Sequence, residues 1–211
     1  MSAASAPVDV FYRERVPAQW NVTLARQEQA AKDDPDARAL LDQMREVEAT
    51  IDVVVSIADT QRTYHLNIRS GRMVADDQAT QNPFIVLAHD LDTFATLERE
   101  SGDSVLGFLG ALAGQPDDMK LTAGRLRNLR MLAGHARIEL TGGAPMRLDA
   151  RFGGALAEAA PSCTLRIGTD VFAALRSGEL APQDAFMTGR VEIVGDMQLA
   201  MQLALAALSP E

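Results

Sequence analysis

Cysteine occurs only once in this 211-residue chain, so no disulfide can form within it. Cys163 begins an apolar, β-branched stretch, which predicts a buried and unreactive thiol. The three histidines, His65, His89 and His135, are isolated, with no second histidine or cysteine at the spacing of metal ligands. We therefore expect no disulfide, no metal site and no cofactor.

Basic residues are also in short supply, with 20 lysines and arginines against 29 acidic residues and a formal net charge of -9. This balance argues against nucleic acid as a partner, and against docking on anionic membranes by bulk charge. No stretch approaches the roughly 18 apolar residues of a membrane span, which predicts no stable membrane insertion. The first residues lack a basic region followed by an apolar one, so we expect a cytoplasmic protein, and the Ala-, Arg- and Asp-rich composition suggests a bacterial one.

Catalytic motifs are missing as well. The sequence contains no Gly-x-Ser-x-Gly, no Gly-x-Gly-x-x-Gly and no phosphate-binding loop. Paired carboxylates at residues 33–34, 76–77 and 117–118 fall in polar breaks, where solvated side chains are expected. Since catalysis requires a base, a nucleophile or an oxyanion site placed together, we expect that the protein is not an enzyme.

The most informative stretch runs from Cys163 to Leu208. Its alternating residues predict strands around residues 164–167 and 191–193. A helix is expected to begin at Val171 with Asp170 as its cap and to end at Gly178, where a left-handed residue is needed. Pro182 begins a second short helix. The last helix, Met197–Leu208, is apolar on every side, so it must bury more than one face.

This stretch resembles the C-terminal half of the sterol carrier protein-2 (non-specific lipid-transfer) family. The run DVFAALRSGELAPQDAFMTGRVEIVGDMQLAMQL carries that family's acidic residue and Phe, Ser-Gly, Pro, Ala-Phe, Gly-Arg strand ending in Gly-Asp, and Leu-Ala-Met helix, in order. The resemblance continues more weakly upstream to about Val47. It implies an α+β fold, a mainly antiparallel sheet covered by helices, with a lipid-holding apolar tunnel and no catalysis.

The resemblance also implies a ligand and a site. The ligand would be a fatty acyl chain, a sterol-like or an isoprenoid molecule. Phe172 and Phe186 are expected to be buried, and the stripe Met197, Met201 and Leu205 is expected to face the tunnel, where flexible methionines suit variable lipid chains. The expected site residues are, on strands, Leu165, Ile167, Val191 and Ile193, and, on helices, Phe172, Leu175, Phe186, Met187, Met197, Met201 and Leu205. The alternative is a non-catalytic accessory, scaffolding or dimerising protein with a packed core. A homodimer is left open under either reading.

The rest of the chain predicts an N-terminal helical extension and two β-rich units. Residues 1–50 are expected to be helical, with a second helix beginning at Asp34-Pro35. Phe11, Tyr12 and Trp20 are expected to pack on the remaining domain, and a partner-binding or lid helix is the alternative. Residues 51–133 form a first unit with bridging helices, and residues 134–211 form the sterol-carrier-like unit.

The two units share a sequence echo. IVLAHDLDTFATL aligns with CTLRIGTDVFAAL, which places Phe94 on Phe172, and hairpin-like pairs precede both. A degenerate internal duplication would explain this similarity, although a chance echo of common elements is the alternative. Between the units, residues 121–132 predict an amphipathic helix whose arginines, Arg125, Arg127 and Arg130, lie on a solvated face or, alternatively, form an anion or head-group site.

Overall fold

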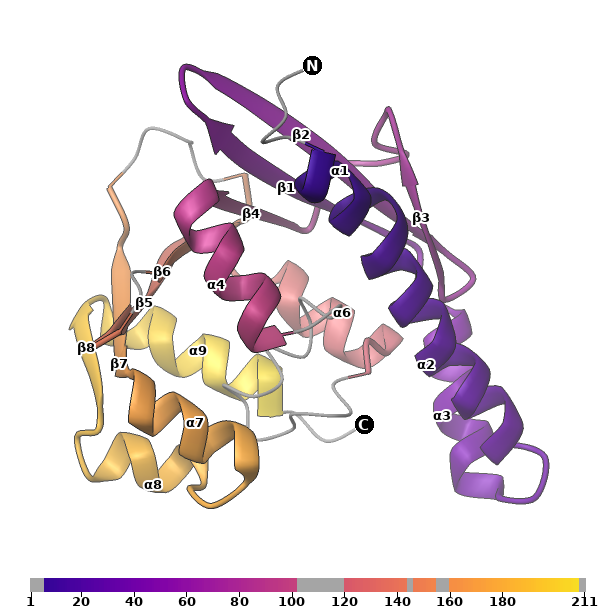
Figure 1. Ribbon diagram of the computed structural model, residues 1–211. Coiled ribbons are helices and arrows are strands. Elements are labelled where there is room, and N and C mark those ends of the chain that lie inside the picture. The colour runs from indigo at the N-terminus through magenta and orange to yellow at the C-terminus, as the bar shows by residue number, and fades with distance from the viewer. Residues whose placement is uncertain (1–5, 102–119, 144–145, 155–159, 209–211) are drawn as a thin grey trace.

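The computed structural model describes residues 6–101, 120–143, 146–154 and 160–208 (Figure 1). The helices are α1 (Ala6–Val10), the π-helical turn η2 (Phe11–Arg15), α2 (Val16–Ala30), α3 (Pro35–Arg45), α4 (Leu91–Ser101), α6 (Ala123–Arg130), α7 (Thr169–Ser177), α8 (Pro182–Met187) and α9 (Met197–Leu208). The strands are β1 (Ala49–Ile57), β2 (Thr60–Arg69), β3 (Arg72–Asp76), β4 (Ile85–Asp90), β5 (Gly134–Thr141), β6 (Met146–Phe152), β7 (Cys163–Gly168) and β8 (Val191–Gly195).

These strands form one 8-stranded sheet, in the order β3-β2-β1-β4-β6-β5-β7-β8. The β1–β4 and β5–β7 pairings are parallel, and the others are antiparallel. The predicted α+β fold with a mainly antiparallel sheet is therefore confirmed. The two β-rich units share this sheet because β4 pairs with β6.

The helices cover one face of the sheet (Figure 1). Because side chains alternate along a strand, Ile51, Leu87 and Ile138 all point into the apolar layer beneath the helices, where they join one large hydrophobic core. The opposite face carries cross-strand charged pairs. Arg137 Nε donates to Asp149 Oδ1 at 2.6 Å, and His65 Nδ1 lies 2.7 Å from Asp52 Oδ1. The apolar and the charged face of the sheet therefore follow from the alternation of apolar and polar residues along the strands.

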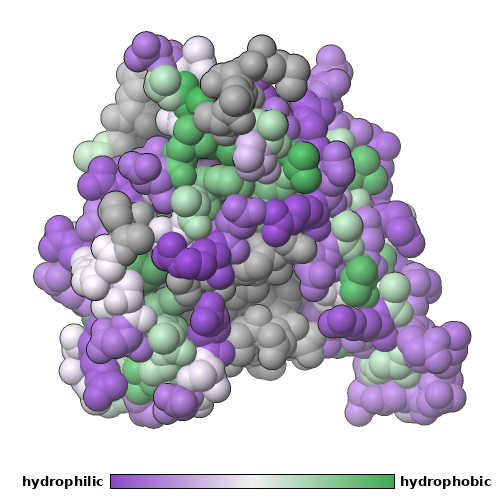
Figure 2. Space-filling model, in the orientation of Figure 1, coloured by the Kyte–Doolittle hydropathy of each residue, from purple (hydrophilic) through white to green (hydrophobic). Residues whose placement is uncertain are grey.

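The N-terminal helices pack as the sequence predicts. Phe11 and Tyr12 are fully buried in the core, which favours the packing interpretation over a lid. Trp20 is half-buried, and its indole donates to the Gly71 carbonyl at 2.8 Å. Asp34 caps α3 by accepting from the Asp36 N–H. Further out, α2 and α3 form a mostly hydrophilic arm at the lower right of Figure 2, held together by the apolar cluster Leu24, Ala31, Leu41 and Met44.

Both units repeat the same connectivity. In the first, the β1–β2 hairpin is followed by β4, parallel to β1, and then by α4. In the second, the β5–β6 hairpin is followed by β7, parallel to β5, and then by α7. Phe94 and Phe172 lie in equivalent helices, and both are buried. The region after Phe94 that was expected to be degenerate lies mostly outside the described residues, and duplication stays a hypothesis.

The expected cap of α7 is wrong. The helix begins two residues earlier than predicted, at Thr169; its N-cap is Gly168, and no side chain caps it, so Asp170 lies inside the first turn. In the first unit, the residue that corresponds to the N-cap Gly168 is Asp90. Its Oδ1 accepts from the Thr93 N–H at 2.8 Å. The sequence places an acidic residue near both helix starts, but only the first unit has it at the capping position. At the other end of α7, Gly178 adopts the predicted left-handed conformation, with φ 75°.

Candidate functional site

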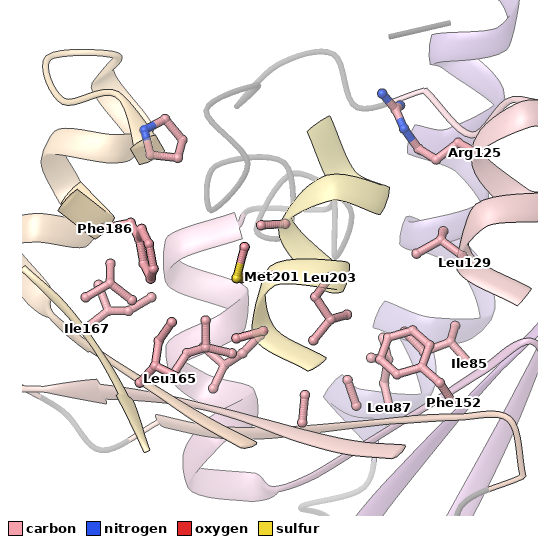
Figure 3. Close-up of a pocket in the computed structure, with 18 of the residues that line it drawn as sticks. Ile85, Leu87, Arg125, Leu129, Phe152, Leu165, Ile167, Phe186, Met201 and Leu203 are labelled. Atoms are coloured by element: carbon pink, nitrogen blue, oxygen red, sulfur yellow. The ribbon is translucent and has the colours of Figure 1, made fainter. Parts of the chain in front are cut away.

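A cavity of about 260 Å³ lies between the sheet and the helices of the second unit (Figure 3). The sheet supplies one wall and α9 lies across it, with α6 on one side and α8 on the other. The lining residues are Ile51, Phe84, Ile85, Leu87, Lys120, Leu121, Arg125, Leu129, Ala136, Ile138, Ala150, Phe152, Leu165, Ile167, Leu175, Pro182, Phe186, Val191, Ile193, Ala200, Met201, Leu203 and Ala204. Hydrocarbon side chains therefore form nearly all of the wall that the described residues supply.

The helix α9 is placed by its own apolar pattern. Asp196 caps it by accepting from the Leu199 N–H at 3.0 Å. Leu199 is only 3% exposed and packs with Ala136 and Cys163 of the sheet. That anchor turns the neighbouring positions, Leu203 among them, toward the cavity. Burial raises the pKa of the Cys163 thiol, as expected for an inert cysteine.

The structure brings seven of the eleven predicted site residues to the cavity wall. They are Leu165, Ile167, Leu175, Phe186, Val191, Ile193 and Met201. The other four lie elsewhere. Phe172 is buried in the core beside the cavity, and Met187, Met197 and Leu205 are 82%, 45% and 65% exposed. That any of these residues binds a ligand stays a prediction.

Two expectations about burial are corrected. Phe186 is 44% exposed, because the short helix α8 lies at the edge of the molecule beside the edge strand β8, and only part of the ring meets the cavity. The stripe Met197, Met201 and Leu205 does not face the cavity as a unit. It lies roughly opposite the sheet-anchored stripe of α9, so only Met201 reaches the wall.

Sequence reasoning missed the part of the wall that comes from outside residues 163–208. Ile51, Ile85 and Leu87 come from β1 and β4 of the first unit, and Phe152 comes from β6. Their alternation marks them as facing the core, but it does not tell which part of the core. The β4–β6 pairing brings them to the cavity, and a sequence carries no signal for that non-local pairing.

Of the lining residues that the structure describes, two are charged, and both are cations. Arg125 on α6 is 4% exposed, and its guanidinium Nη1 donates to the carbonyl oxygen of Lys120, the second cation. Figure 3 shows Arg125 and Phe186 on opposite sides of the cavity, with α9 between them. A buried arginine is thus at the α6 side, which corrects the expectation that all three arginines lie on a solvated face. Arg127 and Arg130 are exposed.

The other ionisable groups of note lie away from the cavity wall. Among the residues that the structure describes, no group of three or more His, Cys, Asp or Glu side chains could hold a metal ion. His89 Nε2 lies 2.6 Å from the Tyr12 hydroxyl, and burial lowers the pKa of this histidine. Neither residue lines the cavity. The cavity can therefore hold an apolar molecule.

Comparison with known proteins finds similarity over part of the chain. No curated protein matches it. Similar solved structures include sterol carrier protein 2 like 2 from Aedes aegypti, at 20% identity over 50% of this chain and 95% of that one with a TM-score of 0.32. Sterol carrier protein 2 from Yarrowia lipolytica matches at 18% identity over 51% and 92%, with a TM-score of 0.30. The sterol carrier protein domain 2 of Helicoverpa armigera matches at 26% identity over 37% and 71%, with a TM-score of 0.27.

In the described part of the chain, no helix has the length and apolar character to cross a membrane.

The decisive match is to a family model, that of the SCP-2 sterol transfer family, which covers residues 119–207. This range includes α6, α7, α8 and α9 and the strands β5 to β8, and thus most of the cavity wall. Residues 119–207 of this chain therefore match the model of the SCP-2 sterol transfer family, as the pattern in residues 163–208 predicts.

Proposed function

We propose that this protein binds a hydrophobic lipid, such as a fatty acyl chain, a sterol-like or an isoprenoid molecule, in the cavity under α9, and transfers it. The observation that carries the proposal is the hydrocarbon lining of that cavity within the segment matched by the SCP-2 family model. Ligand pockets are typically roughly 300–1,000 Å³ and mostly apolar with a few polar groups. A cavity of about 260 Å³ with two cations at its wall comes close to this description.

The cavity favours ligand binding over a core that is packed solid. Protein interiors are normally close-packed, and an empty apolar void loses the van der Waals contacts of its lining. Here the wall contains large, pliable side chains, such as Met201, Leu203 and Phe186, that do not close the space. A hydrocarbon chain in the cavity would restore those contacts, and the partial exposure of Phe186 and Met201 gives it a route in.

Binding without catalysis is part of the same proposal. Among the described residues that line this cavity, none has a carboxylate, imidazole, thiol or hydroxyl side chain. Acid–base and nucleophilic catalysis need such groups within hydrogen-bond reach of the reacting atoms. What supports the proposal is that the polar groups at this cavity, Lys120 and Arg125, are suited to holding a ligand rather than to transforming it.

The experiment that tests the function is native mass spectrometry of the purified full chain, followed by solvent extraction. A co-purifying molecule of a few hundred daltons that is released by organic solvent supports lipid binding. Addition of a fluorescent fatty acid to the delipidated protein should then give saturable binding. A clean apoprotein that takes up neither a fatty acid, a sterol nor an isoprenoid would contradict the proposal.

The accessory alternative is favoured by one observation. The helices α8 and α9 expose apolar side chains, namely Phe186, Met187, Met197 and Leu205. Exposed apolar patches often mark contacts with a partner. Analytical ultracentrifugation of the delipidated protein separates the two roles. A tight homodimer that binds no lipid would favour the accessory role, whereas a lipid-binding monomer would contradict it.

A further inference from the structure

The two edges of the sheet are covered differently. β3 and β8 are its outermost strands, and an edge strand presents main-chain N–H and C=O groups that can pair with another chain. At β3, a side chain of α2 covers these groups. Asn21 Nδ2 donates to the Met73 carbonyl oxygen at 2.9 Å, and Asn21 Oδ1 accepts from the Met73 N–H at 3.0 Å. One amide thus takes the place that a further strand would have at this edge.

At β8, the pairing with β7 identifies the main-chain groups that point to the open side. The Asp196 N–H donates to the carbonyl oxygen of Ser162 at 2.8 Å, and these two residues continue the register of β8 with β7. Hydrogen-bonded and non-hydrogen-bonded pairs alternate along an antiparallel ladder. Val191 and Ile193 belong to the non-hydrogen-bonded pairs, so their N–H and C=O groups point away from β7.

The open side of β8 is also partly apolar. In the part of the chain that the structure describes, no hydrogen bond reaches the outward groups of Val191 or Ile193. The strand has no proline or lysine, which commonly protect an edge. Val194 on β8 and Phe186 and Met187 on α8 are 41%, 44% and 82% exposed. β8 and α8 lie together at the end of the molecule away from α2 and α3 (Figure 1), and this end suits a partner that supplies a strand and apolar surface.

A second copy of β8 fits this edge by direction and by charge. A two-fold axis turns a strand antiparallel to its own copy, so the contact is complementary to itself. With the axis at Ile193, Arg190 of each copy lies opposite Asp196 of the other, and both residues are exposed. With the axis at Glu192, two carboxylates would lie directly opposite each other, which is destabilising. An axis nearer the start of the strand would include Gly189, whose φ of 68° is not extended.

We infer that the protein forms a homodimer in which β8 of one copy pairs antiparallel with β8 of the other, with the two-fold axis at Ile193. The sheet then continues through both copies. This inference is independent of the proposed function, but it involves the same cavity. Val191 and Ile193 line that cavity, and directly opposite residues of an antiparallel pair project from the same face. Ile193 of the second copy therefore extends the apolar wall beyond the edge strand.

Sedimentation equilibrium of the full chain, from low to high micromolar concentration, tests the dimer. We expect a species of twice the mass of the chain. Ile193→Pro should give a monomer, because proline removes the outward N–H but no hydrogen bond to β7, and an edge strand tolerates proline at such a position. Ile193→Val is the matched control, since it keeps the N–H and a β-branched side chain, and it should stay dimeric. Circular dichroism and thermal melting check the fold of each variant.

A charge reversal tests the same contact without touching the strand. Arg190→Glu places a carboxylate opposite Asp196 of the second copy, and like charges across an interface weaken it. The dissociation constant of the dimer should rise at least about tenfold. Arg26→Glu is the matched control, because it makes the same change at an exposed position on α2, and it should leave the constant unchanged.

Cysteine cross-linking reads the register. In a Cys163→Ala background, Ile193→Cys should form a disulfide between copies under mild oxidation, because opposite residues of a hydrogen-bonded pair have Cα atoms about 5.5 Å apart, within disulfide range. Glu192→Cys represents the rejected register and should cross-link far less. The reverse result would overturn the register.

A chain that is monomeric at every concentration overturns the inference, whether or not it binds lipid. So does a folded Ile193→Pro protein that remains fully dimeric. A monomer that binds vesicles of phosphatidylcholine would also overturn it and would assign this end of the molecule to a lipid surface. Titration of the same samples with Nile red measures lipid binding separately, so failure of the proposed function is distinguishable from failure of the dimer.

Discussion

At the scale of single residues, the buried Tyr12–His89 pair joins the N-terminal helices to the sheet. His89 Nδ1 lies 2.8 Å from the Asp90 carbonyl oxygen, which can only accept, so Nδ1 carries the proton and Nε2 accepts from the Tyr12 hydroxyl. The ring also stacks on Phe94. The neutral histidine thus accepts from Tyr12, and protonation of Nε2 would reverse this hydrogen bond and place a positive charge in the buried core.

This arrangement predicts a pH dependence of stability. Burial lowers the pKa of His89 below its ordinary value of 6.5, more than the nearby Asp90 carbonyl raises it. The unfolded chain therefore takes up a proton first, and the stabilisation that is complete above pH 6.5 is lost as the pH falls below it. His89→Gln keeps one donor and one acceptor but does not titrate. In urea unfolding at pH 8 and pH 5, the wild type should lose more stability than this variant, and equal losses would contradict the assignment.

The two phenylalanines of the second unit give a second test at this scale. Phe172 is 2% exposed and Phe186 is 44% exposed. Phe172→Ala should lower the free energy of unfolding by about 3–5 kcal/mol, as for a buried aromatic residue. Phe186→Ala should cost about 1 kcal/mol, because much of its ring is already in water, but it should weaken binding of a fluorescent fatty acid. Chemical denaturation and probe titration measure both effects, and equal destabilisation by the two substitutions would contradict the assigned positions.

At the scale of the element, α9 has three different surroundings. Leu199 and Ala206 are buried, Leu203 and Met201 meet the cavity, and Met197 and Leu205 are largely exposed. A helix that is apolar on every side can be satisfied in this way when a sheet anchors one stripe and a ligand or partner covers another. The helix therefore combines a structural role with a role in the site.

A pair of substitutions on α9 tests the cavity. Met201→Trp should fill the space and strongly reduce the uptake of a fluorescent fatty acid while the melting temperature changes little, because overpacking costs apply only where no space exists. Met197→Trp is the matched control, one turn earlier on the same face and outside the cavity wall, and it should bind normally. A Met201→Trp protein that binds as well as the wild type, or one that unfolds, would contradict the position of the cavity.

At the scale of the whole molecule, one sheet and one core unite the two units. The core extends from Phe11 in the N-terminal turn through Ile51 and Leu148 to Phe172. The boundary predicted at residues 133 and 134 therefore lies between units that share one sheet, at the β4–β6 pairing. Because four residue pairs of the sheet and one shared core cross this boundary, we expect the units to unfold together.

Trp20, the only tryptophan in the chain, makes this expectation measurable. Its fluorescence reports on the first unit, where its indole is bound to the Gly71 carbonyl. Leu148→Ala, in a fully buried position of β6 in the second unit, should cost about 2–5 kcal/mol. The Trp20 fluorescence transition should then shift as far as the circular dichroism transition. If the fluorescence midpoint stayed in place, the two units would unfold independently.

The sequence by itself determined the local structure. Three local signals depend only on neighbours in the chain, so they can be recognised from the sequence alone. They are the alternation of Leu165 and Ile167, Asp34-Pro35 at the start of α3, and Gly178 at the end of α7. The family resemblance could also be recognised from the sequence, because it consists of local signals in a fixed order. The cap of α7 was misplaced by a small shift, since two candidate residues lie within one turn.

Only the tertiary structure decided which apolar faces meet. The pairing of β4 with β6 brought Ile85 and Leu87 to the cavity, the edge position of α8 exposed Phe186, and the anchoring of Leu199 on the sheet turned Met197 and Leu205 outward. It also placed Arg125, one of three arginines on an unremarkable helix, beside the hydrocarbon wall. These outcomes depend on non-local packing, because residues far apart in the chain compete for the same buried space and a local pattern records only that a side chain is apolar or charged.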